Sequence, residues 1–247
     1  MNTSARMPDL LSVSAGHRRA AQEITECAQR GQCCAFLGPR LSGTSEVLQY
    51  VRAALADDPL STCVYVDLRQ VGSATRCEFF GSLARRLCEL AVAEGAKGCA
   101  SLGNDVASGA EFRACLKECS IRLQRSLVLM VDHLHSIPLD LVQALLISLR
   151  AAYMDQDGSG PLIVPIVCGA LGLATLTLGQ SSPFANIARA VFISGLDTEE
   201  SKDFVRICLS SASDRVSDGA RTELLRAAQG DPRLIDQLCR ECVRIVE

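Results

Sequence analysis

The sequence of 247 residues lacks the features of several protein classes. No apolar run reaches about 18 residues, which excludes a predicted transmembrane helix. Residues 1–11 lack the charged start and long apolar core of a secretory signal peptide, so we expect a cytoplasmic protein. The net charge is −3, which provides no general attraction to nucleic acid. We therefore expect neither a membrane nor nucleic acid as a partner.

Histidine is scarce, whereas cysteine is abundant. The three histidines, His17, His133 and His135, are too few and too scattered in sequence to indicate a metal site. The thirteen cysteines fall mostly within apolar patterns, which is typical of reduced, buried thiols in a cytoplasmic protein. Cys239 and Cys242 form a C-x-x-C pair without a second pair at zinc-ribbon spacing. We therefore expect neither a zinc site nor a redox function.

The remaining composition is that of an ordinary globular chain, with 48% hydrophobic and 21% charged residues. Apolar runs that predict buried strands alternate with helical patterns, which indicates a parallel α/β sheet. The expected strands are residues 33–37, 62–68, 126–132, 162–168 and 190–193. The expected helices between them are residues 16–30, 45–56, 75–93, 110–124 and 137–154.

The last part of the sequence carries only helical patterns, at residues 198–210, 217–229 and 232–246. We therefore predict an α/β domain over residues 1–195, with residues 1–15 as a loose leader, and a small helical lid over residues 196–247. The glycine-rich residues 95–109 are expected to form a surface loop. Pro165 lies within an expected strand and predicts either a bulge or a position where no N–H is paired.

The stretch of residues 33–45 has the layout of a phosphate-binding P-loop: a strand, a glycine-bounded loop and a helix. Backbone N–H groups of such a loop point inward, and the helix N-terminus adds partial positive charge. In the pattern G-x-x-x-x-G-K-[ST], Gly38, Gly43 and Ser45 fit, but Thr44 occupies the lysine position. The other interpretation is a plain glycine-containing turn between a strand and a helix.

Without its lysine, the loop loses a charge-assisted hydrogen bond worth roughly 1.5–3 kcal/mol, or about tenfold to a hundredfold in affinity. Catalysis is expected to suffer more, because the lysine also offsets charge in the transition state. Pro39 and Arg40 lie inside the loop, and Arg40 is the one cation there that offers a substitute.

Asp132 ends the most hydrophobic expected strand and is the candidate Mg²⁺ carboxylate. In hydrolysing enzymes of the additional-strand type, a glutamate commonly follows and orients the attacking water. Here the next residue is His133, whose imidazole can accept a proton near neutral pH. The alternatives are that Asp132 caps the following turn and that His133 and His135 are ordinary loop residues. The two positions that support hydrolysis, Thr44 and His133, therefore differ from the pattern, while the strand, loop and helix around them are retained.

Across residues 16–243 the chain resembles the AAA-like (STAND-type) P-loop NTPase domains of bacterial signal-transduction ATPases. The resemblance includes a segment similar to the family's linker into its lid, and a Gly230-Asp231-Pro232 corner similar to its G-x-P lid motif. The blocks that carry it are residues 30–37, 64–68, 71–72, 146–153, 167–170, 182–188, 193–200 and 229–239.

The resemblance implies that ATP or ADP binds between sheet and lid. Gly38, Pro39, Arg40, Gly43, Thr44 and Ser45 would then wrap the phosphates. Ser45 and Asp132 would share Mg²⁺, and Pro232 would lie near the adenine base. The family's lysine and glutamate do not carry over, because Thr44 and His133 stand at those positions.

Two functions from different classes follow. One is a nucleotide-dependent regulatory switch with weak or no hydrolysis, and the other is a catalytically dead pseudo-ATPase that serves as an adaptor or scaffold. Either would act on a protein partner, such as an effector or repeat-containing subunit, and relatives of this type often form homo-oligomers. Arg150 and Arg189 are candidates for an arginine supplied to a neighbouring subunit's site.

Overall fold

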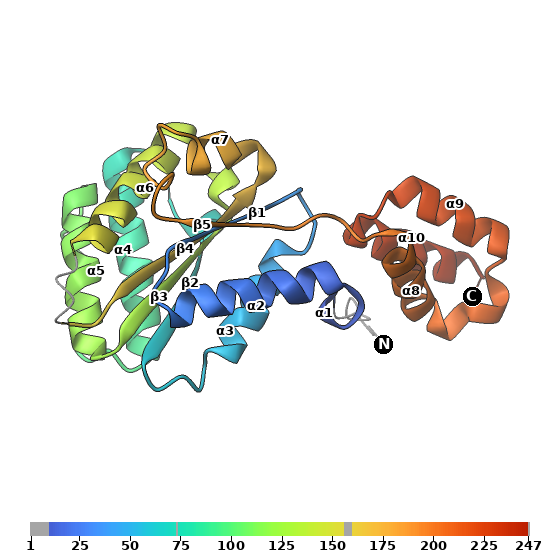
Figure 1. Cartoon of the computed structure of the whole chain (residues 1–247), viewed down its shortest axis with the longest axis horizontal. Helices are drawn as coiled ribbons and strands as arrows, with labels where there is room; N and C mark the ends of the chain where they lie inside the picture. Colours follow the sequence, from blue (N-terminus) through green and yellow to red (C-terminus); the bar gives the residue numbers. More distant parts are fainter. Residues whose placement is uncertain (1–9, 73, 156–159, 247) are drawn as a thin grey trace.

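A computed structural model describes residues 10–72, 74–155 and 160–246. Figure 1 shows a central sheet with helices on both faces and a separate group of C-terminal helices at one end. The five strands are all parallel, in the order β2-β3-β4-β1-β5. Their bounds are β1 Cys34–Gly38, β2 Ser61–Asp67, β3 Ser126–Asp132, β4 Ile163–Ala170 and β5 Arg189–Phe192. The predicted parallel α/β fold with C-terminal helices is confirmed.

Both faces of the sheet are buried because successive strand residues point to opposite sides. In β3, Leu127, Leu129 and Val131 belong to one core cluster, and Val128 and Met130 to the other. The first cluster is covered by α4, α5 and α6, and the second by α2 and α3 (Figure 1). The bounds are α2 Ala15–Gln29, α3 Thr44–Ala54, α4 Arg76–Ala93, α5 Gly109–Leu123 and α6 Leu139–Met154. This double coverage explains the continuous rather than alternating apolar runs.

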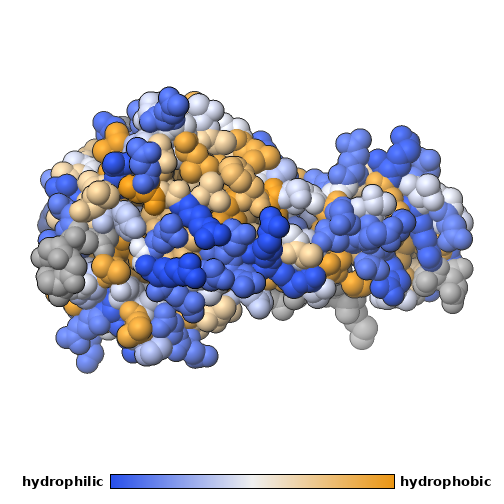
Figure 2. Space-filling view, in the orientation of Figure 1, coloured by the Kyte–Doolittle hydropathy of each residue, from blue (hydrophilic) through white to orange (hydrophobic). Residues whose placement is uncertain are grey.

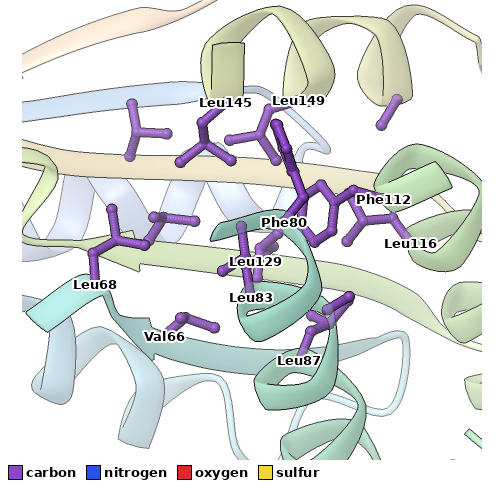
Figure 3. Packing of buried hydrophobic residues seen from close by; sticks show 14 of the residues in the cluster. Val66, Leu68, Phe80, Leu83, Leu87, Phe112, Leu116, Leu129, Leu145 and Leu149 are labelled. Carbon is purple, nitrogen blue, oxygen red and sulfur yellow. The ribbon is translucent and has the colours of Figure 1, made fainter. Parts of the chain in front are cut away.

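The larger cluster is built around aromatic rings that α4 and α5 bring together. Phe79 and Phe80 meet edge to face with centroids 5.3 Å apart, and Phe80 lies 5.8 Å from Phe112. Figure 3 shows Phe80 among leucines from the neighbouring helices and Leu129 of β3. This packing fixes α4 and α5 against the sheet.

Two segments are less loose than predicted. The prediction gave residues 1–15 as a loose leader, of which residues 1–9 lie outside the described residues. The prediction is wrong for residues 10–15, because α1 (Leu10–Val13) is helical and Leu10 and Leu11 are buried. The expected surface loop 95–109 carries buried Ala96 and Cys99. Both segments pack their apolar side chains inward, which sequence polarity alone did not reveal.

Pro165 lies within β4 between two partner strands. The N–H of Leu127 donates to the carbonyl of Leu162, so the backbone N–H and C=O groups of even-numbered β4 residues point toward β3. The backbone nitrogen of Pro165 therefore points toward β1. The ladder with β1 begins only at Ile166, opposite Cys34. Pro165 therefore sits where a missing N–H costs no ladder hydrogen bond, the second of the two predicted explanations.

The C-terminal helices share their own hydrophobic cluster. They are α8 (Thr198–Cys208), α9 (Asp218–Ala228) and α10 (Pro232–Val246), and Phe204 and Ile235 are fully buried among them. Leu10 of α1 joins this cluster, so the N-terminal segment contacts the helical subdomain (α8–α10). The boundary at residue 195 remains our prediction.

The surface seen in Figure 2 is mixed: hydrophobic residues gather on the upper part of the α/β body, and the visible face of the helical subdomain is largely hydrophilic. None of the helices in the described part of the chain combines the length and apolarity needed to cross a bilayer.

Phe80→Ala should lower the free energy of unfolding by about 3–5 kcal/mol, because it removes a buried ring and leaves a cavity in the aromatic cluster. Leu139→Ala is the control, since Leu139 is 65% exposed and should change stability by less than about 0.5 kcal/mol. Denaturant titration followed by circular dichroism measures both. Equal effects of the two substitutions would contradict the assigned core.

Candidate functional site

The loop after β1 turns sharply into α3. Gly43 is the N-cap of α3 at φ +86°, and Leu41 is also left-handed at φ +68°. A Cβ on Gly43 would lie 2.5 Å from Leu10 Cδ1 and 2.9 Å from His17 Nε2. Gly43 is therefore required both by its backbone angle and by the groups packed beneath it.

His17 supports this loop from below. Its Nε2 lies 2.7 Å from the carbonyl oxygen of Ser42, and its Nδ1 lies 2.8 Å from Ser14 Oγ. Burial lowers the pKa of His17, so the ring is neutral, donates from Nε2 to Ser42 and accepts from the Ser14 hydroxyl at Nδ1. A fully buried imidazole thus fixes the position of the loop.

The residue at the lysine position, Thr44, is half-buried, and its hydroxyl reaches the sheet. The thiol of Cys168 on β4, fully buried, contacts both the Thr44 hydroxyl and the Asp132 carboxylate. Burial first, and the Asp132 charge second, raise the pKa of Cys168 well above its ordinary value. Thr44 therefore provides no cation, and its hydroxyl is engaged with the sheet.

Two carboxylates lie side by side where β2 and β3 end. Asp67 and Asp132 are register partners, and His133 Nδ1 lies 3.3 Å from Asp67 Oδ1 and 3.2 Å from Asp132 Oδ2. His133 is held there by a left-handed backbone at φ +62°. His133 Nδ1 is buried and forms no hydrogen bond with either carboxylate.

Neither carboxylate is left without a donor. The Tyr65 hydroxyl donates to Asp132 Oδ2 at 2.7 Å, and the His133 N–H donates to Oδ1 at 2.6 Å. Burial raises the pKa of Asp67, but hydrogen bonds from Arg69 outweigh this and hold it below its ordinary value. Burial and the bond to Asp132 raise the pKa of Tyr65. Asp132 is 1% exposed, so its oxygens face protein donors rather than solvent.

A cleft of about 370 Å³ opens above the loop. Arg40 of the loop, Arg69 after β2 and Arg233 at the start of α10 line it together with His133 and His135. Burial, followed by the nearby His133 and Arg40, lowers the pKa of His135. Glu46 is the only acidic residue among the described lining residues. Three guanidinium groups at a helix N-terminus favour a polyanionic ligand.

The predicted site residues divide into two groups. Those at the cleft are Gly38, Pro39, Arg40, Gly43, Thr44, Ser45 and His133. Asp132 and Pro232 are not among the described lining residues; Asp132 is buried behind them, and the neighbour of Pro232, Arg233, reaches the cleft instead. Arg150 donates to the Pro183 carbonyl, and Arg189 pairs with Glu23 at 3.1 Å. Both candidate arginines are thus engaged within the chain.

Several residues around the site were not predicted. His17 offered no signal, because its contact with Ser42 joins residues 25 positions apart. Asp67 was detectable, since it ends β2 as Asp132 ends β3 and the carboxyl ends of parallel strands meet at one edge. Arg69 directly follows an expected strand and Arg233 lies in the first turn of an expected helix, but the direction of each side chain depends on the turn beside it.

Comparison with solved structures supports the fold. The chain is similar to the Walker-type ATPase PABY2304 of Pyrococcus abyssi, with a TM-score of 0.66, 21% identity, and coverage of 94% of this chain and 69% of that one. Cdc6p of Pyrobaculum aerophilum gives a TM-score of 0.61 and 15% identity, with 98% and 64% covered. The ORC1 protein of Aeropyrum pernix, solved with DNA, gives 0.57 and 14%, with 99% and 68% covered.

No family model and no curated protein matches the sequence. The chain spans about two thirds of the length of the solved structures named above. The expectation that nucleic acid is not a partner gains no support from the comparison, because one of these proteins was solved bound to DNA. These similarities show that the chain has a P-loop NTPase fold.

His17→Gln should reduce the loss of stability on acidification, because Gln retains a donor near Ser42 but does not titrate. The pKa of His17 is depressed in the folded protein, so its stabilising effect is present above about pH 6.5 and is lost as the pH falls, when the unfolded chain takes up the proton first. Melting temperatures between pH 7.5 and 5.5 measure the slope. Arg19→Gln, on the exposed face of α2, is the control, and an unchanged slope in His17→Gln would refute this role.

Proposed function

We propose that this chain is an AAA-like nucleotide-binding domain that acts as a regulatory switch, binding ADP or ATP with Mg²⁺ and hydrolysing it weakly or not at all. The observation that carries the proposal is the cleft above residues 38–45, where Arg40, Arg69 and Arg233 face the N-terminus of α3. In this proposal Ser45 holds Mg²⁺, with Asp132 behind it, and the linear phosphate chain lies along the loop.

The arginines supply the positive charge that Thr44, at the lysine position, does not provide. Arg40 stands within the loop, and Arg69 is held by two hydrogen bonds from its Nε and one from its terminal nitrogen to Asp67. Because guanidinium groups bind phosphate in a bidentate manner, Arg40 and Arg233 would offset the loss of one ammonium group at Thr44, while Arg69, paired with Asp67, adds charge at the edge of the cleft. Binding is therefore retained on this proposal, although the chemistry of the terminal phosphate is weakened.

The helical subdomain contributes the third arginine. Asp231 caps α10 by accepting from the N–H groups of Arg233 and Leu234, at 2.9 and 3.0 Å. The Leu196 N–H donates to the carbonyl of Gly230 at 2.8 Å, and a Cβ on Gly230 would lie 2.3 Å from the Leu196 carbonyl oxygen. This tight corner sets the direction of Arg233, so a bound phosphate would bias the orientation of the whole subdomain.

A second connection links loop and subdomain through α2. The Ala15 N–H donates to Glu200 Oε1 on α8 at 2.7 Å, and His17, two residues on, holds the Ser42 carbonyl. Glu200 also closes the capping box of α8 with Asp197. A shift of the loop on nucleotide binding would therefore reach α8 through one short helix end, which is the coupling that a switch requires.

The resemblance to bacterial STAND-type signalling ATPases extends the proposal to a cytoplasmic protein that acts on an effector or repeat-containing subunit, alone or as a homo-oligomer. The DNA bound by the ORC1 relative makes nucleic acid a further partner to test. Weak hydrolysis follows from the replaced lysine and from His133, whose Nδ1 lies between Asp67 and Asp132.

A pseudo-ATPase scaffold is the second candidate, and a specific observation favours it. Both Asp132 oxygens already accept hydrogen bonds, from Tyr65 and from the His133 N–H, and Asp132 is 1% exposed. Mg²⁺ bound through Asp132 would have to displace the tyrosine hydroxyl. If Mg²⁺ does not displace the Tyr65 hydroxyl, the chain would act as a scaffold, through surfaces that bind a partner protein.

Arg233→Ala should weaken Mg-ADP binding by about tenfold to a hundredfold, since a charge-assisted contact is worth roughly 1.5–3 kcal/mol. Titration calorimetry and thermal melts measure the effect; for the unaltered protein, ligand at 100 times Kd should add about 2.7 kcal/mol. Arg226→Ala is the matched control, because Arg226 pairs with Glu223 on the exposed face of α9. No thermal shift at millimolar nucleotide would favour the scaffold.

The double variant Thr44→Lys, His133→Glu should hydrolyse ATP faster than the unaltered protein, because it restores the cation and the water-orienting carboxylate to a retained frame. Phosphate release measures the rate, and the single variants separate the two contributions. If the double variant binds Mg-ATP but releases no phosphate, the assigned roles of these two positions are wrong.

A further inference from the structure

Four buried cysteines converge on the far side of the sheet from α2 and α3. Cys88 lies on α4, Cys115 and Cys119 lie one turn apart on α5, and Cys99 lies in the loop between the two helices. Cys88 Sγ is 3.6 Å from Cys115 Sγ and 3.9 Å from Cys119 Sγ, and the three sulfurs lie within 4.8 Å of one another. The Cys99 thiol contacts Cys119.

The separations among Cys88, Cys115 and Cys119 match three corners of a mononuclear metal site, because four sulfurs bound tetrahedrally at a Zn–S distance of about 2.3 Å lie about 3.8 Å from one another. Cys99 lies beside this group of three, next to Cys119. The spacing of the chain also suits the geometry, because two ligands at i and i+4 on one helix share a face, and the other two come from a helix and a loop packed against it. No other group of at least three potential ligands is found among the described residues.

The surroundings provide donors and a cation. The backbone N–H of Gly103 donates to the Cys88 sulfur, and the guanidinium of Arg122 lies close enough to influence both Cys88 and Cys99. Arg122 also donates to the Gly98 carbonyl and, at 2.7 Å, to Glu118, so it links α5 to the loop. N–H donors and a nearby cation are the partners that stabilise thiolates around a metal.

We propose that Cys88, Cys99, Cys115 and Cys119 form a structural tetrathiolate site for Zn²⁺ that fastens the loop of residues 94–108 to α4 and α5. Each ligating thiol would release its proton, and four thiolates with one dication would leave two net negative charges, which Arg122 and the Gly103 N–H partly offset. This site lies outside the phosphate cleft and does not depend on nucleotide binding.

The geometry favours a metal over packed thiols. Three sulfurs from two helices lie within 4.8 Å of one another, and the fully buried Cys99 comes from the loop of residues 94–108, which has no strand or regular helix. The other cysteines of the described residues form no such group of three.

The test measures metal in the full chain purified without metal-affinity steps. Elemental analysis should find close to one zinc ion per chain, and substitution with Co²⁺ should give the intense visible bands and near-ultraviolet charge-transfer absorption of a tetrahedral thiolate site. Cys119→Ser should lose most of the zinc. Cys63→Ser, a buried cysteine outside the cluster, should retain it.

Cys99→Ser is a second variant for the case in which Cys119→Ser does not fold, because Cys99 lies in a loop and its substitution is the milder change. This variant should bind Co²⁺ with a weaker charge-transfer band. It should also exchange zinc with a chelator at least tenfold faster than the unaltered protein. A strong chelator should also lower the melting temperature of the unaltered protein. The proposal is overturned if the chain is metal-free and binds no Co²⁺, if Cys99→Ser holds zinc as tightly as Cys63→Ser, or if intact mass shows a disulfide between Cys88 and Cys115.

Discussion

The site depends on one buried hydrogen bond, from the neutral imidazole of His17 to the carbonyl of Ser42. The loop also holds itself through the Ser42 N–H, which donates to the Pro39 carbonyl at 3.3 Å. The imidazole meets the Ser42 carbonyl, and Gly43 leaves just enough room for the ring. The geometry of the cleft therefore rests partly on α2, which is not among the described segments that line it.

Charge is distributed unevenly around this loop. Arginines from three separate segments face the cleft, whereas Asp67 and Asp132 lie behind it with their oxygens already bonded to Arg69, Tyr65 and the His133 backbone. The charges of such a cleft favour a polyanion, whereas the oxygens of Asp132, the carboxylate assigned to Mg²⁺ in the proposed function, already accept hydrogen bonds from the protein. On that proposal, a switch and a scaffold differ in whether a bound ligand displaces the Tyr65 hydroxyl from Asp132.

The cysteines illustrate how one residue type serves different purposes in one fold. Cys34 and Cys168 are small, fully buried residues of the sheet; the contact with Cys27, and then burial, raise the pKa of Cys34, and burial raises the pKa of Cys168. Cys88, Cys115 and Cys119 lie within 4.8 Å of one another, the arrangement on which the proposed zinc site rests. The neighbours of a thiol therefore decide whether it packs as a small apolar group or can serve as a metal ligand.

The sequence by itself determined the parallel sheet, because apolar runs such as residues 126–132 alternate with helical patterns, and it placed the loop at residues 38–45 and the C-terminal helices. Element bounds differed from the structure by about one or two residues, since helix ends depend on caps such as Ser14 and Asp197. Contacts between distant residues were decided only by the tertiary structure: His17 beneath the loop, Arg233 above it, Tyr65 on Asp132, and Cys88 beside Cys119. The physical reason is that periodicity records which face of an element is buried, whereas these pairings depend on how elements far apart in the chain are packed.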